Sequence, residues 1–378
     1  MKVGIICHPS IGGSGLVATQ LGIGLAHRGH EVHFISRAMP FRLSGRESNV
    51  HFHPVEPVYY PLFDDSLYTF SLTAKIAEVA EKHDVGIMHA HYSIPHSLCV
   101  HLARQISRRD FHTVTTIHGT DSTLLGQDRP LYPLNRFSID QSDVVTTVSN
   151  FQRRYIREHL HLDRDIEVIH NFIDPDAFKP ELASLETRRT MAEDGEKIVM
   201  HVSNFRLPKN TAGVVKAFAR AVRKVRARLV LIGDGPELEQ VKVLCRELKI
   251  ANRVTFMGKV NPIEAIIPNA DCVLQPSYTE SFGMVSLEAM ASGVPPVTST
   301  RDGIPEVVVH GETGLTADPD DHQGLADHVV ALCRDDVLHE KLARNGRQRA
   351  IDHFLWDRQV DRYLQTYNQC QDNQKISA

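Results

Sequence analysis

Residues 2–36 read KVGIICHPSIGGSGLVATQLGIGLAHRGHEVHFIS, and this stretch decides the fold. It starts with an apolar run, 2–7, passes through a glycine-rich loop, and then repeats apolar residues at helical spacing as far as Gly29. A second apolar run, 31–36, follows at once. A strand, a helix and another strand in this order predict two parallel strands joined by a helix that covers one face of the sheet.

The same alternation continues along the chain in two series. The polar stretch 179–196 separates them, so two doubly wound α/β domains are expected, with the hinge near residues 165–180. A chain of 378 residues agrees with two domains, because single cores rarely grow beyond about 300 residues. The expected strands are 2–7, 31–36, 85–91, 113–118 and 143–149 in the first series, and 197–203, 227–233, 253–258, 271–276 and 295–299 in the second.

Composition and charge are typical of a soluble globular protein. The chain has 42 Lys and Arg against 46 Asp and Glu, so bulk charge indicates neither a nucleic-acid nor a membrane partner. No apolar run is long enough to span a bilayer, and the N-terminal run is interpreted as a buried strand instead of a signal peptide. The six cysteines are scattered without a CxxC pair, which predicts reduced core thiols in a cytoplasmic protein.

Histidine is abundant, with 22 residues, and three local groupings raise the question of a metal. They are HFH (51–53), HAHYSIPH (89–96) and HLH (159–161). None has a recognised zinc-binding spacing, and no carboxylate is interleaved as a ligand in the first two. The sequence therefore predicts no metal site.

The glycine-rich loop of the first stretch raises the alternative of a nicotinamide-dependent oxidoreductase. That class needs G-x-G-x-x-G after the first strand and an acidic residue about 20 positions further on. Here GGSG (12–15) is followed by Leu16 and Val17, so the fingerprint fails. The loop still opens a helix, and the first turn of a helix presents N–H groups to an anion.

Charged residues in loops that follow strands are informative, because open α/β sheets bind ligands beyond the carboxyl ends of their strands. SNFRLPKN (203–210) places Arg206 and Lys209 just after an expected strand. Two cations at this position can flank a diphosphate. A solvated surface pair is the alternative, and the spacing alone does not decide between them.

YTESFGMVSLEAMASGVPPV (278–297) carries the strongest pattern. Glu280 lies just before a helix that begins near Gly283, and Glu288 lies inside it in an apolar run, where an unpaired charge would be costly. The helix start offers N–H groups to a phosphate. Carboxylates normally repel a phosphate, so two of them beside a phosphate site indicate that they bind hydroxyl groups. The pattern therefore predicts a sugar at one carboxylate and a ribose at the other.

In the first series, TTIHGTDST (115–123) follows an expected strand. His118 ends that strand, Gly119 lets the backbone approach a ligand, and His118, Thr120 and Asp121 are all expected to point toward it. A lone histidine at a strand end is more often structural. The charged loops that follow the other expected strands favour a functional interpretation of His118.

Together these residues resemble the retaining glycosyltransferases of family 4, over essentially the whole chain. The E-x7-E element of that family corresponds to Glu280 and Glu288, and its basic pair corresponds to Arg206 and Lys209. The resemblance implies an α/β protein of GT-B fold, with two doubly wound Rossmann-like domains facing a central cleft. The implied division is an acceptor domain, 1–168 with a returning C-terminal helix 356–378, and a UDP-sugar-binding domain, 169–355.

The resemblance also implies a role for each matched residue. Glu288 would hold the ribose of UDP, Glu280 the hydroxyls of the sugar, and Arg206 with Lys209 the diphosphate. His118 would contact the transferred sugar near its reacting carbon. Further donor contacts are implied for Gly13, Ser14, Gly258, Ser281, Phe282, Gly283 and Met284.

The N-terminal half resembles the branch of the family that transfers GlcNAc from UDP-GlcNAc to the hydroxyl of L-malate, the first step of bacillithiol biosynthesis. The motifs that carry this are HPSIGGSGLVATQ, PFRL, HAHYSIPHSLC, TTIHGTDSTLLG and HNFID. The resemblance implies no cofactor and no catalytic metal, and it allows a homodimer. Another nucleotide sugar, or a lipid-linked or glycan acceptor, stays open as an alternative. The implied acceptor contacts are Ser14, Gly15, Tyr92, Thr120, Asn150 and Arg153.

Overall fold

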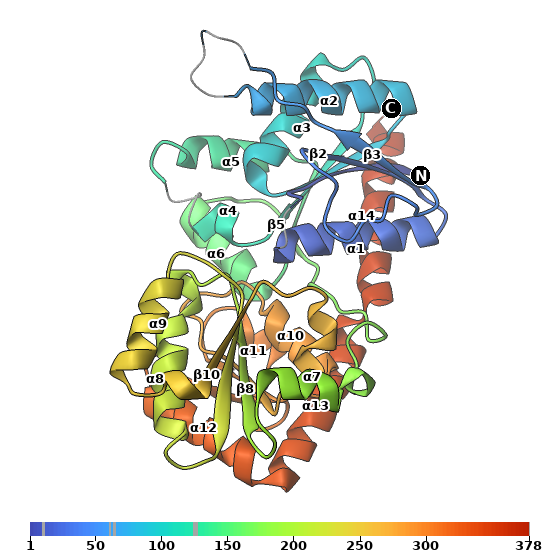
Figure 1. Ribbon diagram of the computed structural model, residues 1–378. Helices are drawn as coiled ribbons and strands as arrows, with labels where there is room; N and C mark the ends of the chain where they lie inside the picture. The colour runs from blue at the N-terminus through green and yellow to red at the C-terminus, as the bar shows by residue number, and fades with distance from the viewer. Residues whose placement is uncertain (10–11, 60–61, 63–65, 124–127, 378) are drawn as a thin grey trace. The chain divides into compact units, whose positions relative to one another are not determined.

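The computed structural model describes residues 1–377 except 10–11, 60–61, 63–65 and 124–127. The chain divides into two compact units. Unit 1 comprises Met1–Asn171 and Trp356–Ala378, and unit 2 comprises Phe172–Leu355. Each unit contains one parallel sheet with helices on both faces, so each has the Rossmann-like architecture that the sequence predicts (Figure 1).

Unit 1 contains a seven-stranded sheet in the order β3-β2-β1-β4-β5-β6-β7, in which every neighbouring pair is parallel. Strands β2 and β3 lie on one side of β1, and the later strands, from β4 on, lie on its other side, so the strand order reverses between β1 and β4. Sheets of this kind bind ligands beside such a reversal, at the carboxyl ends of the strands. The strands are β1 (Lys2–Ile6), β2 (Glu31–Ser36), β3 (Val50–Pro54), β4 (Ile87–His91), β5 (His112–Ile117), β6 (Val144–Thr147) and β7 (Glu167–Val168).

The helices of unit 1 pack in two layers, with α2 and α3 on one face of the sheet and α1 and α14 on the other (Figure 1). Close packing of α1 requires a glycine, because a Cβ at Gly22 would lie 2.3 Å from a ring carbon of Phe34 on β2. The helices are α1 (Gly13–His27), α2 (Tyr68–His83), α3 (Leu98–Ile106), α4 (Thr120–Thr123), α5 (Tyr132–Asp140), α6 (Asn150–Leu160) and α14 (Trp356–Ser377).

The last helix, α14, belongs to unit 1 although unit 2 precedes it in the chain. Trp356 Nε1 donates a hydrogen bond to the carbonyl oxygen of Gln20 (3.0 Å) on α1. Further along, the buried Tyr367 hydroxyl lies 2.7 Å from His89 Nδ1 on β4. The C-terminal helix therefore returns to the first unit, as the sequence predicts.

Unit 2 contains a six-stranded parallel sheet in the order β10-β9-β8-β11-β12-β13. Side chains of α8, α9 and α12 form an apolar core with strands of this sheet, and α10 contacts α13. The strands are β8 (Lys197–Val202), β9 (Ala227–Ile232), β10 (Val254–Gly258), β11 (Cys272–Gln275), β12 (Pro296–Ser299) and β13 (Leu315–Ala317). The helices are α7 (Leu185–Met191), α8 (Thr211–Ala221), α9 (Leu238–Glu247), α10 (Met284–Ala291), α11 (Ile304–Val307), α12 (His322–Arg334) and α13 (Asp336–Phe354).

The sequence did not predict three of these strands, β3, β7 and β13. All three lie at sheet edges, and β7 and β13 have only two and three residues. An edge strand buries less of its surface, so it lacks the continuous apolar run that identifies a central strand. In the described part of the chain, no helix is long and apolar enough to cross a bilayer.

Candidate active site

In unit 2, two loops that follow adjacent strands are joined by an ion pair. The loop after β8 runs into a short 3-10 turn, Leu207–Lys209, and the loop after β11 carries Glu280. Lys209 Nζ lies 2.5 Å from Glu280 Oε2, and the two side chains are 29% and 22% exposed. Arg206, at the start of the turn, is exposed. The structure thus brings both predicted cations to the same edge of the sheet as the first predicted carboxylate.

Asn210 joins these two loops by hydrogen bonds, and it was not among the predicted site residues. Its Oδ1 accepts from the N–H of Gly213 (3.0 Å) and caps α8. Its Nδ2 donates to the carbonyl oxygens of Pro276 (3.0 Å) and Pro319 (3.1 Å). The only sequence signal was an asparagine directly before an expected helix, which is typical of a cap.

Asp302 holds the backbone around Glu280 from the other side. Its Oδ2 accepts from the N–H of Glu280 (3.1 Å), while the N–H of Gly303 donates to the carbonyl oxygen of Glu280 (3.0 Å). Burial raises the pKa of Asp302, and the hydrogen bond from Glu280 opposes that rise. Asp302 was not among the predicted site residues either, although an Asp-Gly dipeptide after an expected strand is a turn signal.

Helix α10 begins close to Glu280 in the chain, and its first turn is where the sequence predicts an anion site. Gly283, just before its first residue Met284, has φ +107, a conformation that favours glycine. The N–H groups of the first turn have no partner within the helix and are available to a phosphate. Ser281 is half-buried, whereas the Phe282 ring is buried against Phe354, so Phe282 can offer a ligand only its backbone.

Gly283→Ala is expected to destabilise the protein by about 2 kcal/mol and to weaken UDP binding by about tenfold. The new Cβ would lie 2.9 Å from Ile304 Cδ1 and would strain the turn that aims the first amides of α10. Gly311→Ala is the matched control, because Gly311 also has a positive φ (+73) but no atom within 4 Å of the added carbon. Titration calorimetry with UDP should show weaker binding by Gly283→Ala than by Gly311→Ala. Equal UDP affinities in the two variants would contradict the assignment of this helix start.

The remaining predicted donor residues of unit 2 lie at the same carboxyl edge. Glu288 is one turn inside α10 and only 7% exposed. Gly258 ends β10 with φ +64, and its carbonyl oxygen accepts from the N–H of Gly233 (2.7 Å). A Cβ at Gly233 would lie 1.7 Å from the carbonyl oxygen of Ser203, so this glycine lets the loop after β9 rest on the loop that carries Arg206.

In unit 1, His118 follows β5 and belongs to a contact network of aromatic rings. His118 Nε2 lies 2.9 Å from His91 Nδ1, and its ring stacks on that of Tyr92, with centroids 5.8 Å apart. Burial lowers the pKa of His118 to about 3. The ring is therefore neutral at physiological pH, and it can exchange hydrogen bonds without carrying a charge.

The expectation that Asp121 points toward a ligand is wrong. Its side chain is fully buried and accepts from the backbone N–H groups of Gly119 (2.8 Å), His118 (3.2 Å) and Ser93 (3.3 Å). Burial raises its pKa to about 6, and these hydrogen bonds oppose the rise. Asp121 therefore holds together the loops after β4 and β5 and is a positioning residue.

The predicted acceptor residues share one edge of the unit 1 sheet. They follow four strands that are neighbours in the sheet, β1, β4, β5 and β6. Arg153 Nη2 donates to Asn150 Oδ1 (2.9 Å) within the first turn of α6. Their roles toward a ligand stay predictions. The residues are Ser14 and Gly15 after β1, Tyr92 after β4, Thr120 after β5, and Asn150 with Arg153 after β6; Gly13, predicted as a donor contact, directly precedes Ser14.

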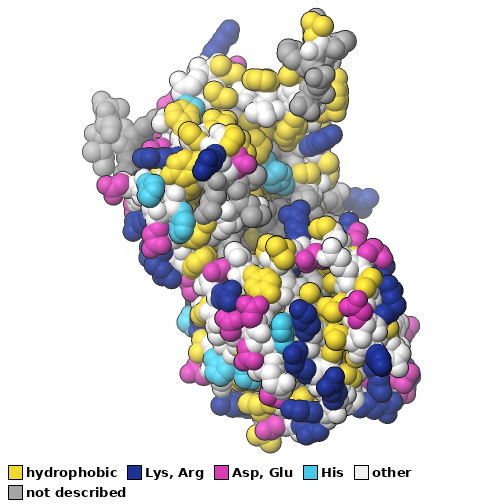
Figure 2. All heavy atoms as spheres, turned by 90° about the vertical axis from the view of Figure 1, so that its left-hand side faces the viewer, with side chains coloured by type: hydrophobic (Ala, Val, Ile, Leu, Met, Phe, Trp, Pro, Cys, Tyr) yellow, Lys and Arg dark blue, Asp and Glu magenta, His cyan; other side chains and the backbone are white. Residues whose placement is uncertain are grey.

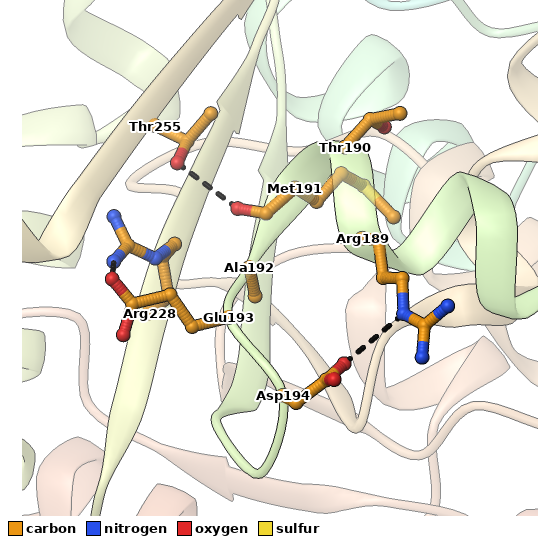
Figure 3. A pocket seen from close by; sticks show the side chains of 8 residues that line it. All are labelled: Arg189, Thr190, Met191, Ala192, Glu193, Asp194, Arg228 and Thr255. Carbon is orange, nitrogen blue, oxygen red and sulfur yellow. Dashed lines mark hydrogen bonds and ion pairs between the residues drawn. The ribbon is translucent and has the colours of Figure 1, made fainter.

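A shallow hollow of about 490 Å³ lies elsewhere in unit 2 (Figure 3). Arg228 and Thr255 line it from near the amino ends of β9 and β10, at the opposite edge of the sheet from Glu280. Its charges are paired within the hollow, because Arg189 Nε lies 3.2 Å from Asp194 Oδ1 and Arg228 pairs with Glu193. It is therefore no part of the candidate active site.

Two family domains match the chain in sequence. The domain described as Glycosyltransferase Family 4 matches residues 11–177, and the domain described as Glycosyl transferases group 1 matches residues 185–349. N-acetyl-alpha-D-glucosaminyl L-malate synthase from Bacillus anthracis is 42% identical over 97% of this chain and 96% of its own. The glycosyltransferase MJ1607 from Methanocaldococcus jannaschii is 26% identical over 92% of both chains.

Solved structures show the same fold. A glycosyltransferase from Rickettsia africae has a TM-score of 0.82 at 18% identity, covering 98% of this chain and 99% of that one. Anabaena Alr3699/HepE in complex with UDP and glucose has a TM-score of 0.80 at 21% identity, covering 97% and 99%. These structures confirm the expected GT-B fold with its two Rossmann-like domains. The two family domains and the 42% identical relative show that the chain belongs to glycosyltransferase family 4.

Proposed function

We propose that the protein is a retaining glycosyltransferase that transfers GlcNAc from UDP-GlcNAc to the hydroxyl group of L-malate, the first step of bacillithiol biosynthesis. The observation that carries the proposal is the 42% identity, over 97% of the chain, to the N-acetyl-alpha-D-glucosaminyl L-malate synthase of Bacillus anthracis. The geometry of unit 2 supports it, because cations for a diphosphate and carboxylates for hydroxyl groups lie at one sheet edge.

In this proposal unit 2 binds the donor. Glu288 binds the ribose hydroxyls, Glu280 binds hydroxyls of the GlcNAc ring, and the loop at Gly258 contacts the uracil. Lys209 and Arg206 flank the diphosphate together with the first amides of α10. The Lys209–Glu280 ion pair supports this arrangement, since it keeps a cation next to the carboxylate that binds the sugar.

The transfer step follows from these charges. The bond between the anomeric carbon of GlcNAc and the phosphate oxygen breaks, and a bond to the malate hydroxyl oxygen forms on the same face of the sugar. Lys209, Arg206 and the start of α10 stabilise the negative charge on the departing UDP, so the step needs no metal. The hydroxyl proton passes to an oxygen of the departing phosphate.

Unit 1 binds malate in this proposal. Malate has two carboxylates, and the first turn of α1 at Gly13–Gly15 and the guanidinium of Arg153 are donors suited to them. His118 contacts the sugar as a neutral ring, because burial lowers its pKa to about 3. A neutral ring does not oppose the positive charge that develops on the sugar during transfer.

The cysteines support a cytoplasmic location for this reaction. All six are free and buried. Burial raises the pKa of the Cys7 thiol to about 12, which keeps it protonated and unreactive. Unpaired thiols are typical of proteins from reducing compartments.

Incubation with UDP-GlcNAc and L-malate, without added metal, tests the proposed function. We expect UDP and GlcNAc-malate in equal amounts, with NMR showing that the anomeric configuration of the donor is kept. Release of UDP that does not depend on malate would contradict the acceptor. Absence of turnover with any UDP- or GDP-sugar would contradict the assignment as an active enzyme.

Glu288→Ala is expected to weaken UDP binding by about 10-fold to 100-fold, because charge-assisted hydrogen bonds to the ribose are lost. Calorimetric titration with UDP measures the change directly. Glu247→Ala, which removes an exposed carboxylate from α9, should bind UDP like the unchanged protein. An unaltered affinity in a folded Glu288→Ala protein would refute the ribose role.

A lipid-linked acceptor is the second candidate, and exposed apolar side chains of unit 1 favour it. Helix α5 exposes Leu134 and Phe137, and the segment before α2 exposes Val58 and Leu62, the last by 82%. Figure 2 shows hydrophobic side chains beside Lys and Arg on this face of unit 1. Co-sedimentation with phosphatidylglycerol vesicles, together with no transfer to malate, would favour this candidate.

A further inference from the structure

Four histidines from three segments of unit 1 converge at one edge of its sheet. His33 lies on β2, His51 and His53 lie on the edge strand β3, and His83 is the last residue of α2. His33 is in register with His51, and His53 shares the face of His51 because alternate residues of a strand point the same way. These four residues and Glu31 are called the histidine cluster below.

The imidazole rings of the cluster contact one another. His33 Nδ1 lies 3.0 Å from His53 Nε2. The ring centroid of His83 lies 4.8 Å from that of His33 and 5.0 Å from that of His53. One nitrogen from each of these three residues falls within 4.8 Å of the other two. Small local adjustments would bring all three nitrogens to the spacing of ligands around one ion.

Glu31 approaches the cluster from the first position of β2. Its Oε1 lies 3.2 Å from His33 Nε2 and 3.3 Å from His51 Nε2. His33 is fully buried, yet its Nε2 forms no hydrogen bond of good geometry with any residue that the structure describes. A carboxylate beside the outer nitrogen of a metal-binding histidine commonly fixes which nitrogen faces the metal. Glu31 is placed to do this for His33.

The donor set of the cluster fits a transition metal. His33 is fully buried, and His53 and His83 are half-buried, so the rings are partly shielded from solvent. Neutral imidazole is a preferred ligand of zinc and of the neighbouring divalent transition metals.

We propose that the histidine cluster binds one divalent transition-metal ion of the class represented by Zn²⁺, with His33, His53 and His83 as ligands. Glu31 orients His33, and His51 lies beside the site without being a ligand. The sequence predicted no metal site because it was searched for local spacings, whereas these ligands come from three segments of the chain. Only the tertiary structure brings them together.

The location of the cluster indicates a structural ion and not a catalytic one. Lys2, the first residue of β1, lies 3.6 Å from Glu31 and donates to the carbonyl oxygen of His83 (2.9 Å), so the cluster adjoins the amino end of β1. Tyr92 and His118 follow the carboxyl ends of their strands. An ion at the cluster would fasten the edge strand β3 and the end of α2 to β2, and would thereby stabilise unit 1.

Zinc binding by the untagged full-length protein tests the proposal. The protein is stripped with EDTA, exchanged into metal-free buffer and titrated with Zn²⁺, and Co²⁺ absorption serves as a second readout. We expect one ion per chain. A free Zn²⁺ concentration about 100 times Kd should raise the Tm by about 5 °C. The Tm is followed by the fluorescence of the single tryptophan, Trp356, which lies in unit 1.

Two histidine substitutions on the same strand make the test specific. His53→Gln should lose the tight site and the rise in Tm, while the matched control His51→Gln should keep both. His83→Gln, a change at a half-buried helix end, should also lose the site and gives a second variant if His53→Gln folds poorly. Equal binding by all proteins, absence of tight binding in the unchanged protein, or loss in His51→Gln alone would each overturn the proposal.

Discussion

Lys209→Ala is expected to lower kcat by about 100-fold to 1,000-fold while leaving the fold intact. Lys209 lies in a short turn that has no buried residue, so few packing contacts are lost. Its ammonium is the cation that the structure places beside Glu280, at 2.5 Å, and in the proposed reaction it stabilises the charge that develops on UDP. Because that charge is greatest in the transition state, the loss should appear mainly in kcat and only weakly in KM.

Two controls separate this role from a loss of local order. Lys224→Ala breaks another lysine–carboxylate pair of unit 2, with Asp327 at 2.7 Å, and should retain full activity. Lys209→Ala combined with Glu280→Gln removes both charges of the site pair. If Lys209 served only to neutralise Glu280, the double variant would recover activity. Such a recovery, or a loss of less than about threefold in Lys209→Ala, would contradict the proposed role.

Asp121→Ala is expected to destabilise unit 1 by about 3 kcal/mol, because the buried N–H groups of Gly119, His118 and Ser93 lose their common acceptor. The loops after β4 and β5 would then lose their mutual position, so transferase activity should fall although the Asp121 side chain is fully buried. Urea unfolding followed by Trp356 fluorescence reports on unit 1, since this is the only tryptophan of the chain. Asp140→Ala, an exposed carboxylate on α5, is the control. Equal urea midpoints would contradict the expected effect.

The pH dependence of Asp121→Asn provides a separate test. Burial raises the pKa of Asp121 from an ordinary value of 3.8 to about 6, so between these values the folded protein holds a proton that the unfolded chain releases. The contribution of Asp121 to the free energy of unfolding is therefore fully present below about pH 4. It declines by about 3 kcal/mol in total as the pH rises to about 6. Asparagine does not titrate. The free energy of unfolding of the unchanged protein should thus fall relative to Asp121→Asn across this range, and parallel pH profiles would contradict the assignment.

The central strands and the order of elements could be predicted from the sequence. Buried parallel strands such as β1 and β11 consist largely of apolar residues, and the helices between the strands repeat at a different period. The edge strands were missed for the opposite reason. β3 reads VHFHP, and its histidines conceal a strand whose polar side chains find partners only on β2 and α2.

The residues that contact a ligand in the proposal were easier to predict than those that position them. Lys209 and Glu280 stand out because charges after strand ends have few structural reasons to be there, and the structure joins them. Asn210, Asp302 and Asp121 act through backbone atoms of distant loops, and such contacts leave no spacing pattern in a sequence. Asp121 was noticed only as part of a motif, and its direction was predicted wrongly.

The sequence by itself determined the two α/β series, the family and the loops to which the proposal assigns the chemistry, because hydrophobic period and strand-end position are local properties. The tertiary structure alone decided which of these residues meet. It paired Lys209 with Glu280 across 71 positions of the chain, turned Asp121 inward, and gathered the histidine cluster from three segments. Contacts of this kind depend on strand order and register, which place residues far apart in the chain within a few ångströms of each other.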